Sequence, residues 1–339
     1  MPVLRFVKGT DPLVRLLLVA IVMASVVPAK GAIRPVAQDV SNVAIFLLFL
    51  LNGLRLPRHE VRAGLRDWRF LLPLVLWCFA AMALLGWLLS RAGSVWLPPQ
   101  VAIGLLFLGV LPSTVQSATA YSSLAGGNVA SSVVAAAVLN ILGVLVTAPL
   151  FALLAGSAAP AFDWNGLERI GLILLLPFAI GQVLQHRAGH LVREHKEVAT
   201  WMDRISIAIP VYVAFSGAVE QGLWQRMGLA AWAALALLVL LFLALGFGGA
   251  WLLGGVLGFE RPTRVSFLFS GGQKSITLGA PLANVLFPPA VAGLLLLPVL
   301  TYHLLQLVLS APLAARLRQA PMPGGSAAGI APTTTAPPR

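Results

Sequence analysis

Charged residues are scarce in this chain of 339 residues. Asp, Glu, Lys and Arg together make up 10% of it, while aliphatic, aromatic and cysteine residues make up 59%. A soluble domain carries about 25% charged residues, because its surface faces water. A chain this apolar lacks the polar groups to cover itself, so its outer surface must face lipid. The scarcity of charge excludes a soluble domain and predicts an all-α polytopic membrane protein whose main partner is the lipid bilayer.

Cysteine and metal-binding motifs are equally rare. Cys78 is the single cysteine, so no intrachain disulfide can form. The sequence has no CxxC or HExxH motif, and we expect neither a cofactor nor a His/Cys metal site. The 23 Lys and Arg outnumber the 11 Asp and Glu. They lie in short gaps between apolar runs rather than on a soluble basic face, so we expect no nucleic-acid partner.

Long apolar runs dominate what is present. Ten stretches can cross a hydrocarbon core of about 30 Å, which predicts one membrane domain over residues 1–318. A tail rich in Pro, Ala and Thr follows over 319–339, and we expect it to be disordered. The ten stretches lie near residues 12–28, 38–54, 70–90, 98–125, 129–155, 165–185, 205–222, 229–257, 264–286 and 289–311.

The basic residues test the number of spans independently. If the N-terminus is cytoplasmic, the alternating loops leave only Lys30, Arg34, Arg91 and Arg226 outside, as the positive-inside rule requires. We therefore expect both termini in the cytoplasm and the protein in the cell inner membrane. A signal peptide over residues 1–31 is the alternative, but its removal would invert this charge pattern.

The spans fall into two sets of five, over about 12–155 and 165–311, separated by a gap near 156–164 without Lys or Arg. Five spans per half place the halves in opposite orientations, which is the arrangement of an inverted-topology repeat. The fourth span of each half is interrupted. One interruption holds Pro112 within a polar run, and the other holds Gly271 and Gly272.

These two interruptions predict a binding site. Pro removes a backbone donor and a Gly pair weakens a helix. Backbone freed from a helix inside a bilayer must be buried in protein or line a wet cavity. Two broken helices at corresponding places in two halves are typical of a transporter's binding site. The alternative interpretation is a pair of simple kinks, with hydroxyls bonded back to the helix.

Lys274 stands beside the second break, in the middle of a span. A charge at the bilayer centre costs at least about 2.5–3.5 kcal/mol, so such a residue usually faces the protein interior. Lys274 is then either satisfied by carbonyls at the helix break, or a counter-charge for an anion or a titrating group in coupling. All the acids fall in loops or near span ends, and we expect no buried carboxylate. A positive interior, with half-helix N-termini, favours a small organic anion as substrate.

At these segments the sequence resembles the bile acid:sodium symporter superfamily, particularly its SBF-like branch. The resemblance is carried by residues 111–117 (LPSTVQS), 124–130 (LAGGNVA), 272–275 (GQKS) and 278–281 (LGAP). It implies ten helices in two inverted repeats, with helices 4 and 9 unwinding and crossing near the midplane. It also implies alternating access by rigid movement of one domain against another, and uptake of bile acids, steroid sulfates or smaller carboxylates with sodium.

The sequence departs from this family where sodium binds. Relatives that bind sodium carry a glutamate about one turn before Gln273, and this chain has Phe269 there. After that Gln the relatives commonly have Asn, and this chain has Lys274. These departures argue against sodium coupling, since an ammonium group could serve as the fixed charge. The candidate sodium ligands that remain are Ser117, Thr119, Ser132 and Gln273.

The candidate site gathers the polar residues at both breaks. We interpret the other polar residues at membrane depth (Asn52, Asn140, Tyr212, Ser216, Tyr302, His303 and Gln306) as interhelical hydrogen-bonding groups. The substrate- or ion-binding candidates are Lys274, Gln273, Ser275, Ser113, Thr114, Gln116, Ser117, Thr119, Ser132 and Asn284.

Three other functions compete with a secondary transporter. A membrane-embedded Ser/Lys hydrolase would pair Lys274 with a hydroxyl, but adjacent helical residues point about 100° apart, and we expect no enzyme. A channel would show polar stripes along several helices, whereas most spans are apolar all round. A non-transporting regulator would have the same sequence features as a carrier, and only a flux measurement separates the two.

Overall fold

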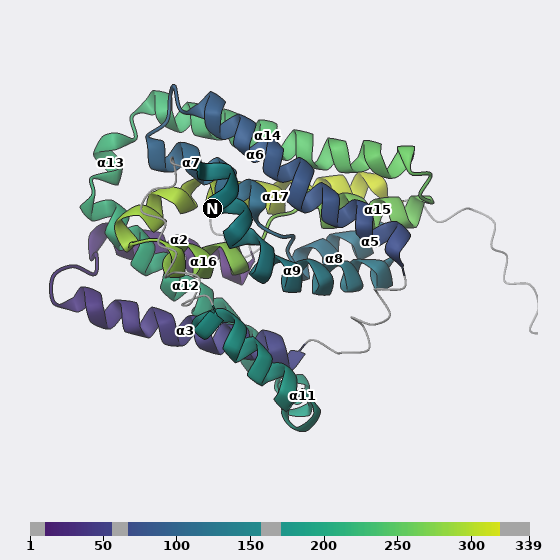
Figure 1. Ribbon diagram of the computed structural model, residues 1–339, viewed down its shortest axis with the longest axis horizontal. Helices are drawn as coiled ribbons and strands as arrows, with labels where there is room; N and C mark the ends of the chain where they lie inside the picture. The colour runs from purple at the N-terminus through teal and green to yellow at the C-terminus, as the bar shows by residue number, and fades with distance from the viewer. Residues whose placement is uncertain (1–10, 56–66, 157–170, 319–339) are drawn as a thin grey trace, which may run out of the picture.

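The structure is a computed structural model that describes residues 11–55, 67–156 and 171–318 (Figure 1). Every regular element within these ranges is helical, as predicted. The elements, with η for a π-helical segment, are α2 (Pro12–Val26), α3 (Ile33–Arg55), α5 (Trp68–Leu76), η1 (Trp77–Ala81), α6 (Met82–Gly93), α7 (Pro99–Val110), α8 (Gln116–Leu124), α9 (Val129–Ala155), η3 (Gly171–Leu175), α11 (Leu176–Glu194), α12 (Lys196–Glu220), α13 (Leu223–Arg226), α14 (Leu229–Val256), α15 (Arg261–Gly272), α16 (Ile276–Leu286) and α17 (Pro289–Leu317).

The membrane assignment rests on six helices that are long and apolar enough to cross a bilayer. They are Ile33–Arg55, Trp68–Gly93, Val129–Ala155, Lys196–Glu220, Leu229–Val256 and Pro289–Leu317. Helices α2 and α7 are apolar but shorter. The ten predicted spans correspond to these six helices together with the short α2, the interrupted helices α7–α8 and α15–α16, and α11. The predicted tail over 319–339 and residues 157–164 of the predicted junction lie outside the described residues.

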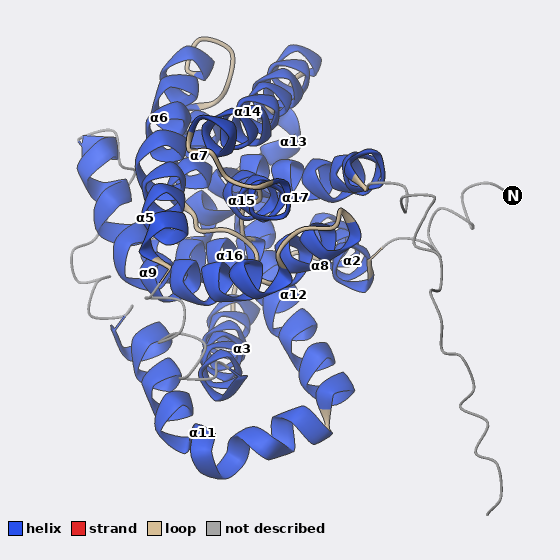
Figure 2. Ribbon diagram, turned by 90° about the vertical axis from the view of Figure 1, so that its right-hand side faces the viewer, coloured by secondary structure: helices blue, strands red, loops and turns tan. Residues whose placement is uncertain are grey.

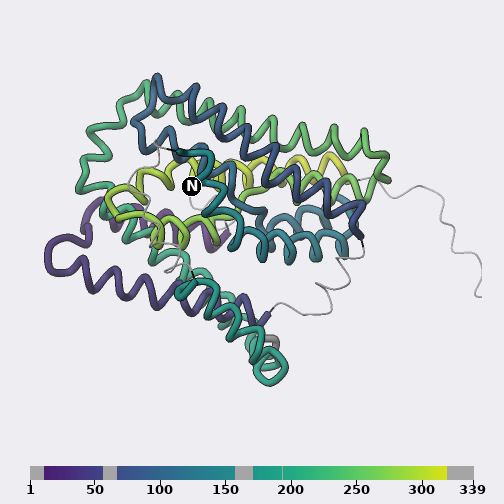
Figure 3. Tube along the Cα trace, in the orientation of Figure 1, coloured from purple at the N-terminus to yellow at the C-terminus, as the bar shows by residue number. Residues whose placement is uncertain are grey.

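The helices form two groups. Helices α2, α3, α11 and α12 make the first group, in which α3 packs on α11 and α12, and α12 packs on α2. Helices α5 to α9 and α14 to α17 make the second group. Figure 2 shows α3 and α11 standing apart from α6, α7 and α14, and the trace in Figure 3 shows the same separation from another side. The groups meet mainly where α12 packs against α17.

Glycines allow the closest helix contacts. A Cβ atom on Gly181 of α11 would lie 2.3 Å from the carbonyl oxygen of Leu50 on α3, and Gly53 faces Gly181 at the same contact. In membranes, helices associate through such small residues because lipid offers no hydrophobic driving force. The first group therefore depends on two backbones approaching with no side chain between them.

A matched pair of glycine variants tests this packing. Gly181→Ala is expected to lower the stability of the protein by about 1–3 kcal/mol, since the added methyl meets backbone that cannot move aside. At Gly248 of α14 a Cβ would meet nothing within 4 Å. Gly248→Ala should therefore be neutral or stabilising by up to about 1 kcal/mol through helix propensity. Thermal unfolding in detergent measures both, and equal effects would contradict the packing described.

Candidate functional site

The two predicted breaks meet in the middle of the second helix group. Helix α7 ends at Val110 before α8 begins at Gln116, and α15 ends at Gly272 before α16 begins at Ile276. The backbone N–H of Ser275 in one break donates to the carbonyl oxygen of Pro112 in the other, at 2.9 Å. We call this junction, residues 111–115 and 273–275, the crossing. Residues 111–114 and 273–275 of the crossing are buried in protein, as the bilayer requires of backbone freed from a helix.

Gln273 ties the crossing together through its side chain. The Gln273 Oε1 atom accepts hydrogen bonds from the hydroxyls of Thr114 and Ser117, each at 2.5 Å. These two hydroxyls lie 2.6 Å from each other. The Gln273 Nε2 atom donates to the hydroxyl of Ser310 on α17, at 3.4 Å. One amide thus links α8, the second break and α17.

Gln306 of α17 holds the backbone of Lys274. Its Oε1 atom accepts from the Lys274 N–H at 2.8 Å, and its Nε2 atom donates to the Lys274 carbonyl at 3.0 Å. The same Nε2 atom lies 2.9 Å from Nδ1 of His303. The backbone N–H and the carbonyl of Lys274, which the helix break leaves without helical partners, are therefore both satisfied by one side-chain amide. This explains how the break is tolerated in a buried position.

The Lys274 ammonium is enclosed by backbone oxygens. Lys274 is 1% exposed, and its Nζ atom donates to the carbonyls of Leu111 at 2.6 Å, Gly109 at 2.8 Å and Cys78 at 3.2 Å. Gly109 and Leu111 lie at the C-terminal end of α7, where carbonyls lack intrahelical partners and a positive charge is favoured. Lys274 is thus satisfied by carbonyls at a helix break, the first of the two interpretations offered by the sequence.

A cavity of about 860 Å³ lies between the helix groups and reaches the crossing. Its wall includes residues of α3, α11 and α12 on one side and of α8, α9, α16 and α17 on the other. The crossing contributes Thr114 and Ser275 to the wall, and the adjoining helices α8, α16 and α17 add the uncharged polar side chains of Gln116, Ser117, Thr277 and His303. Gln273 and Lys274 are not part of the described lining and lie behind this wall.

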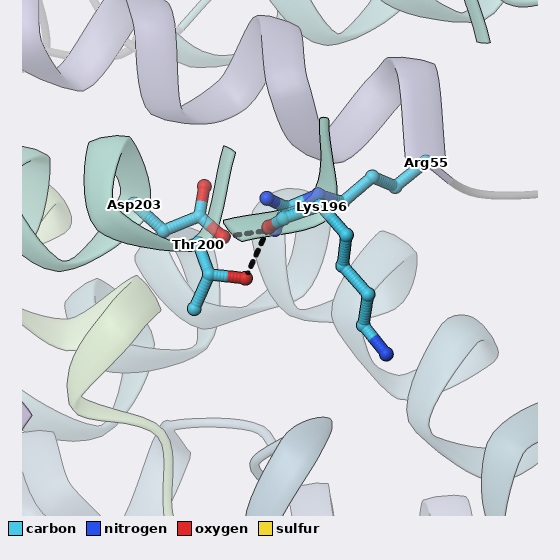
Figure 4. Close-up of polar contacts among 4 residues, drawn as sticks. All are labelled: Arg55, Lys196, Thr200 and Asp203. Atoms are coloured by element: carbon cyan, nitrogen blue, oxygen red, sulfur yellow. Dashed lines mark hydrogen bonds and ion pairs between the residues drawn. The ribbon is translucent and has the colours of Figure 1, made fainter. Parts of the chain in front are cut away.

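Helix α12 brings charge to the same cavity. Lys196, Thr200, Asp203 and Arg204 line it, and their spacing places them on one face of the helix. Asp203 forms an ion pair with Arg55 from the end of α3, as Figure 4 shows. Asp203 is 6% exposed and lies within α12. The expectation that no carboxylate is buried is therefore wrong, because α12 begins about two turns before the predicted span.

The remaining predicted site residues are Ser132, Asn284, Ser113 and Thr119. Ser132 is 3.4 Å from the hydroxyl of Ser270. The amide of Asn284 donates to the carbonyls of Pro210 and Ala280, both at 2.9 Å, so it joins helices and is outside the described lining of the cavity. The hydroxyls of Ser113 and Thr119 are buried and make no hydrogen bond within the described part of the chain.

Two of the candidate sodium ligands, Ser117 and Gln273, are hydrogen-bonded to each other. A third, Ser132, lies beside the hydroxyl of Ser270. Phe269, where the family resemblance places the glutamate of sodium-binding relatives, is fully buried and stacks on Tyr121 with ring centroids 5.9 Å apart. Within the described ranges no group of three or more His, Cys, Asp and Glu residues could hold a metal ion.

Sequence reasoning missed the charged wall of the cavity. Arg55, Lys196 and Arg204 were counted only as basic residues of cytoplasmic segments, and Asp203 as one of the acids in loops or near span ends. The spacing of Lys196, Thr200 and Asp203, at i, i+4 and i+7, was the available signal for one polar helix face. Asn52, Asn140 and His303 also line the cavity, although the sequence interpretation made them interhelical hydrogen-bonding groups.

Comparisons with known proteins find similar membrane transporters and an uncharacterized relative. A model of the SBF-like CPA transporter family matches residues 11–319. The chain is 39% identical over 303 residues to the uncharacterized protein PA2026 of Pseudomonas aeruginosa, covering 88% of this chain and 90% of that protein. It is 33% identical over 319 residues to the putative symporter YfeH of Escherichia coli, covering 93% and 95%. It is 24% identical over 306 residues to sodium/bile acid cotransporter 7 of Mus musculus, covering 86% and 88%.

Proposed function

Because the chain belongs to the SBF-like CPA transporter family, within the bile acid:sodium symporter superfamily, we propose that it is a secondary active transporter of an organic anion. It is an integral multi-pass membrane protein. In the proposed arrangement ten helices form two inverted repeats, over about 12–155 and 165–311. The protein lies in the cell inner membrane with both termini in the cytoplasm.

The observation that carries this proposal is a cavity that reaches two joined helix breaks. The cavity lies between the two helix groups, so a rigid movement of one group against the other would change its opening from one side of the membrane to the other. The substrate would rest at the crossing, against Thr114, Ser117 and Ser275.

An anion suits this site better than a cation. Helices α8 and α16 both begin at the crossing, and Gln116, Ser117, Thr277 and Leu278 from their first turns line the cavity. The N-terminus of a helix presents free N–H groups and a partial positive charge, which stabilise a bound anion. The buried ammonium of Lys274 lies behind the same wall and adds to the positive field.

We propose that transport does not require sodium. Phe269 fills the position of the relatives' glutamate with an aromatic stack. The Lys274 ammonium donates to the carbonyls of Cys78, Gly109 and Leu111. In this proposal its fixed charge replaces that of a bound cation. These two side chains support a mechanism without a sodium-dependent step.

Counterflow in proteoliposomes tests the transporter assignment. Liposomes containing the purified protein and loaded with unlabelled cholate should accumulate labelled cholate against its gradient, whereas protein-free liposomes should not. Accumulation would exclude a non-transporting regulator. Binding of cholate without counterflow would instead favour that regulator.

The geometry gives no support to the Ser/Lys hydrolase. The Lys274 ammonium donates to three carbonyls, while the Ser275 hydroxyl caps α16 by accepting from the Leu278 N–H at 3.3 Å. A nucleophilic serine needs a base within hydrogen-bonding distance of its hydroxyl. The two adjacent side chains thus bond to different helix ends and not to each other. Hydrolysis of an ester substrate by the purified protein would contradict this description.

A further inference from the structure

The charges in the described cavity wall do not come from the crossing. They are Asp11, Arg55, Lys196, Asp203 and Arg204. Asp11 is occupied at the start of α2, where its Oδ1 atom accepts from the Leu13 N–H at 2.7 Å. Arg55, Lys196 and Arg204 therefore form the cationic part of the wall, with Asp203 as the acid among them. Since Lys274 lies behind the wall, the anionic group of a substrate can contact only these cations directly.

Arg55 and Asp203 are paired through a single contact. Arg55 Nη1 donates to Asp203 Oδ2. The Nη2 atom of Arg55 and the Oδ1 atom of Asp203 are buried and have no partner among the residues that the structure describes. Arginine binds a carboxylate most strongly through two parallel hydrogen bonds. The pair therefore leaves half of the guanidinium fork and half of the carboxylate unused.

Both partners line the cavity, but they differ in exposure. The Arg55 side chain is 27% exposed, whereas that of Asp203 is 9% exposed. The Thr200 hydroxyl lies one helical turn before Asp203. It donates to the Lys196 carbonyl at 2.7 Å and not to the Asp203 carboxylate (Figure 4). A buried carboxylate held by one hydrogen bond is poorly compensated for its loss of water. An anion arriving from the cavity could bind Arg55 in a better geometry.

We propose that Arg55 is the residue that binds the anionic group of the substrate, and that Asp203 holds Arg55 as an internal counter-ion while the cavity is empty. This inference rests on the proposed function and identifies the charge partner of the transported anion. The substrate it favours is a carboxylate or sulfate attached to an apolar body. Apolar side chains such as Phe49, Phe178, Leu278 and Leu307 also line the cavity.

A second ion pair between the same helices offers a matched control. Arg34 at the start of α3 pairs with Glu220 at the end of α12. This pair ties the opposite end of the two antiparallel helices, and neither residue belongs to the described lining of the cavity. A purely structural role of Arg55–Asp203 would make it behave as Arg34–Glu220 does.

Affinities of the full-length purified protein for cholate, a steroid sulfate and uncharged methyl cholate test the inference. Wild type should bind the two anions but not the ester. Arg55→Gln should weaken anion binding about tenfold or more, because a charge-assisted hydrogen bond is lost. Asp203→Asn should tighten it several-fold, because the competing carboxylate is gone. Glu220→Gln should leave the affinity unchanged. Arg55→Lys keeps the charge but loses the planar guanidinium group, so its affinity should lie between those of wild type and Arg55→Gln.

Each contrary result has a distinct meaning. If Arg55→Gln and Asp203→Asn both weaken binding, or neither changes it, the ion pair is structural and the inference is overturned, while the proposed function stands. If wild type binds neither anion, the proposed anion transport itself is overturned and this inference with it. Thermal unfolding of each variant, with Arg55→Lys as the milder substitution, shows whether a loss of binding reflects a loss of fold.

Discussion

Lys274→Ala is expected to destabilise the protein strongly and to abolish transport. The lysine ammonium donates to three buried carbonyls, those of Cys78, Gly109 and Leu111. Each buried acceptor left without a partner costs about 1–3 kcal/mol, so the three together predict a loss of at least about 3 kcal/mol. The end of α7 would no longer be held against the second break, and the cavity wall at the crossing would change shape.

The same variant should gain a response to sodium. Removing the lysine side chain leaves three carbonyl oxygens around a space from which one positive charge has been withdrawn. Hard cations prefer oxygen ligands, so sodium chloride should raise the melting temperature of Lys274→Ala more than choline chloride does. Lys274→Met fills the space with an apolar side chain. It should be as unstable as Lys274→Ala, but sodium chloride should not raise its melting temperature more than choline chloride does. A sodium response in wild type, or none in Lys274→Ala, would refute the idea that the ammonium stands in place of a cation.

Gln273→Leu should reduce transport at least about tenfold while the protein still folds. Leucine is similar in size but removes the acceptor shared by the hydroxyls of Thr114 and Ser117 and the donor to Ser310. Unsatisfied buried polar groups predict a loss of stability of about 1–3 kcal/mol. Because the two hydroxyls line the cavity, their reorientation should disturb substrate binding more than it disturbs the fold.

Ser122→Ala is the control for this prediction. The Ser122 hydroxyl lies 2.7 Å from that of Ser266 and joins α8 to α15, and it is outside the described lining of the cavity. Ser266 keeps the carbonyls of Asn128 and Pro262 as partners when Ser122 is removed. Uptake rates in proteoliposomes should therefore be normal for Ser122→Ala and low for Gln273→Leu. Equal rates for the two variants would show that Gln273 has no special role in transport.

Local sequence chemistry predicted the positions of the two breaks. Pro112 and the pair Gly271–Gly272 weaken a helix, and helix α7 ends at Val110 while α15 ends at Gly272. That the two breaks bond to each other was expected only from the resemblance to a family. Such contacts depend on how distant segments pack, and neither helix alone carries that information.

The partners of buried charges were harder to predict. Lys274 was recognised as buried, but its three carbonyl partners lie more than 160 positions away in the chain. Asp203 was assigned to a span end because hydropathy marks where a helix enters lipid and not where it begins. Helix α12 begins at Lys196, and this earlier start places Asp203 beside Arg55. Pairs of this kind follow from tertiary packing, which a single sequence does not reveal.

The initial rate of labelled cholate uptake into proteoliposomes, in sodium chloride and in choline chloride, tests the central claim most directly. If the crossing carries an organic anion while the Lys274 ammonium replaces a bound cation, uptake should occur at the same rate in both salts. Uptake that occurs only in sodium would contradict the claim, because it would require a sodium site that the carbonyl-bound lysine and the buried Phe269 do not provide.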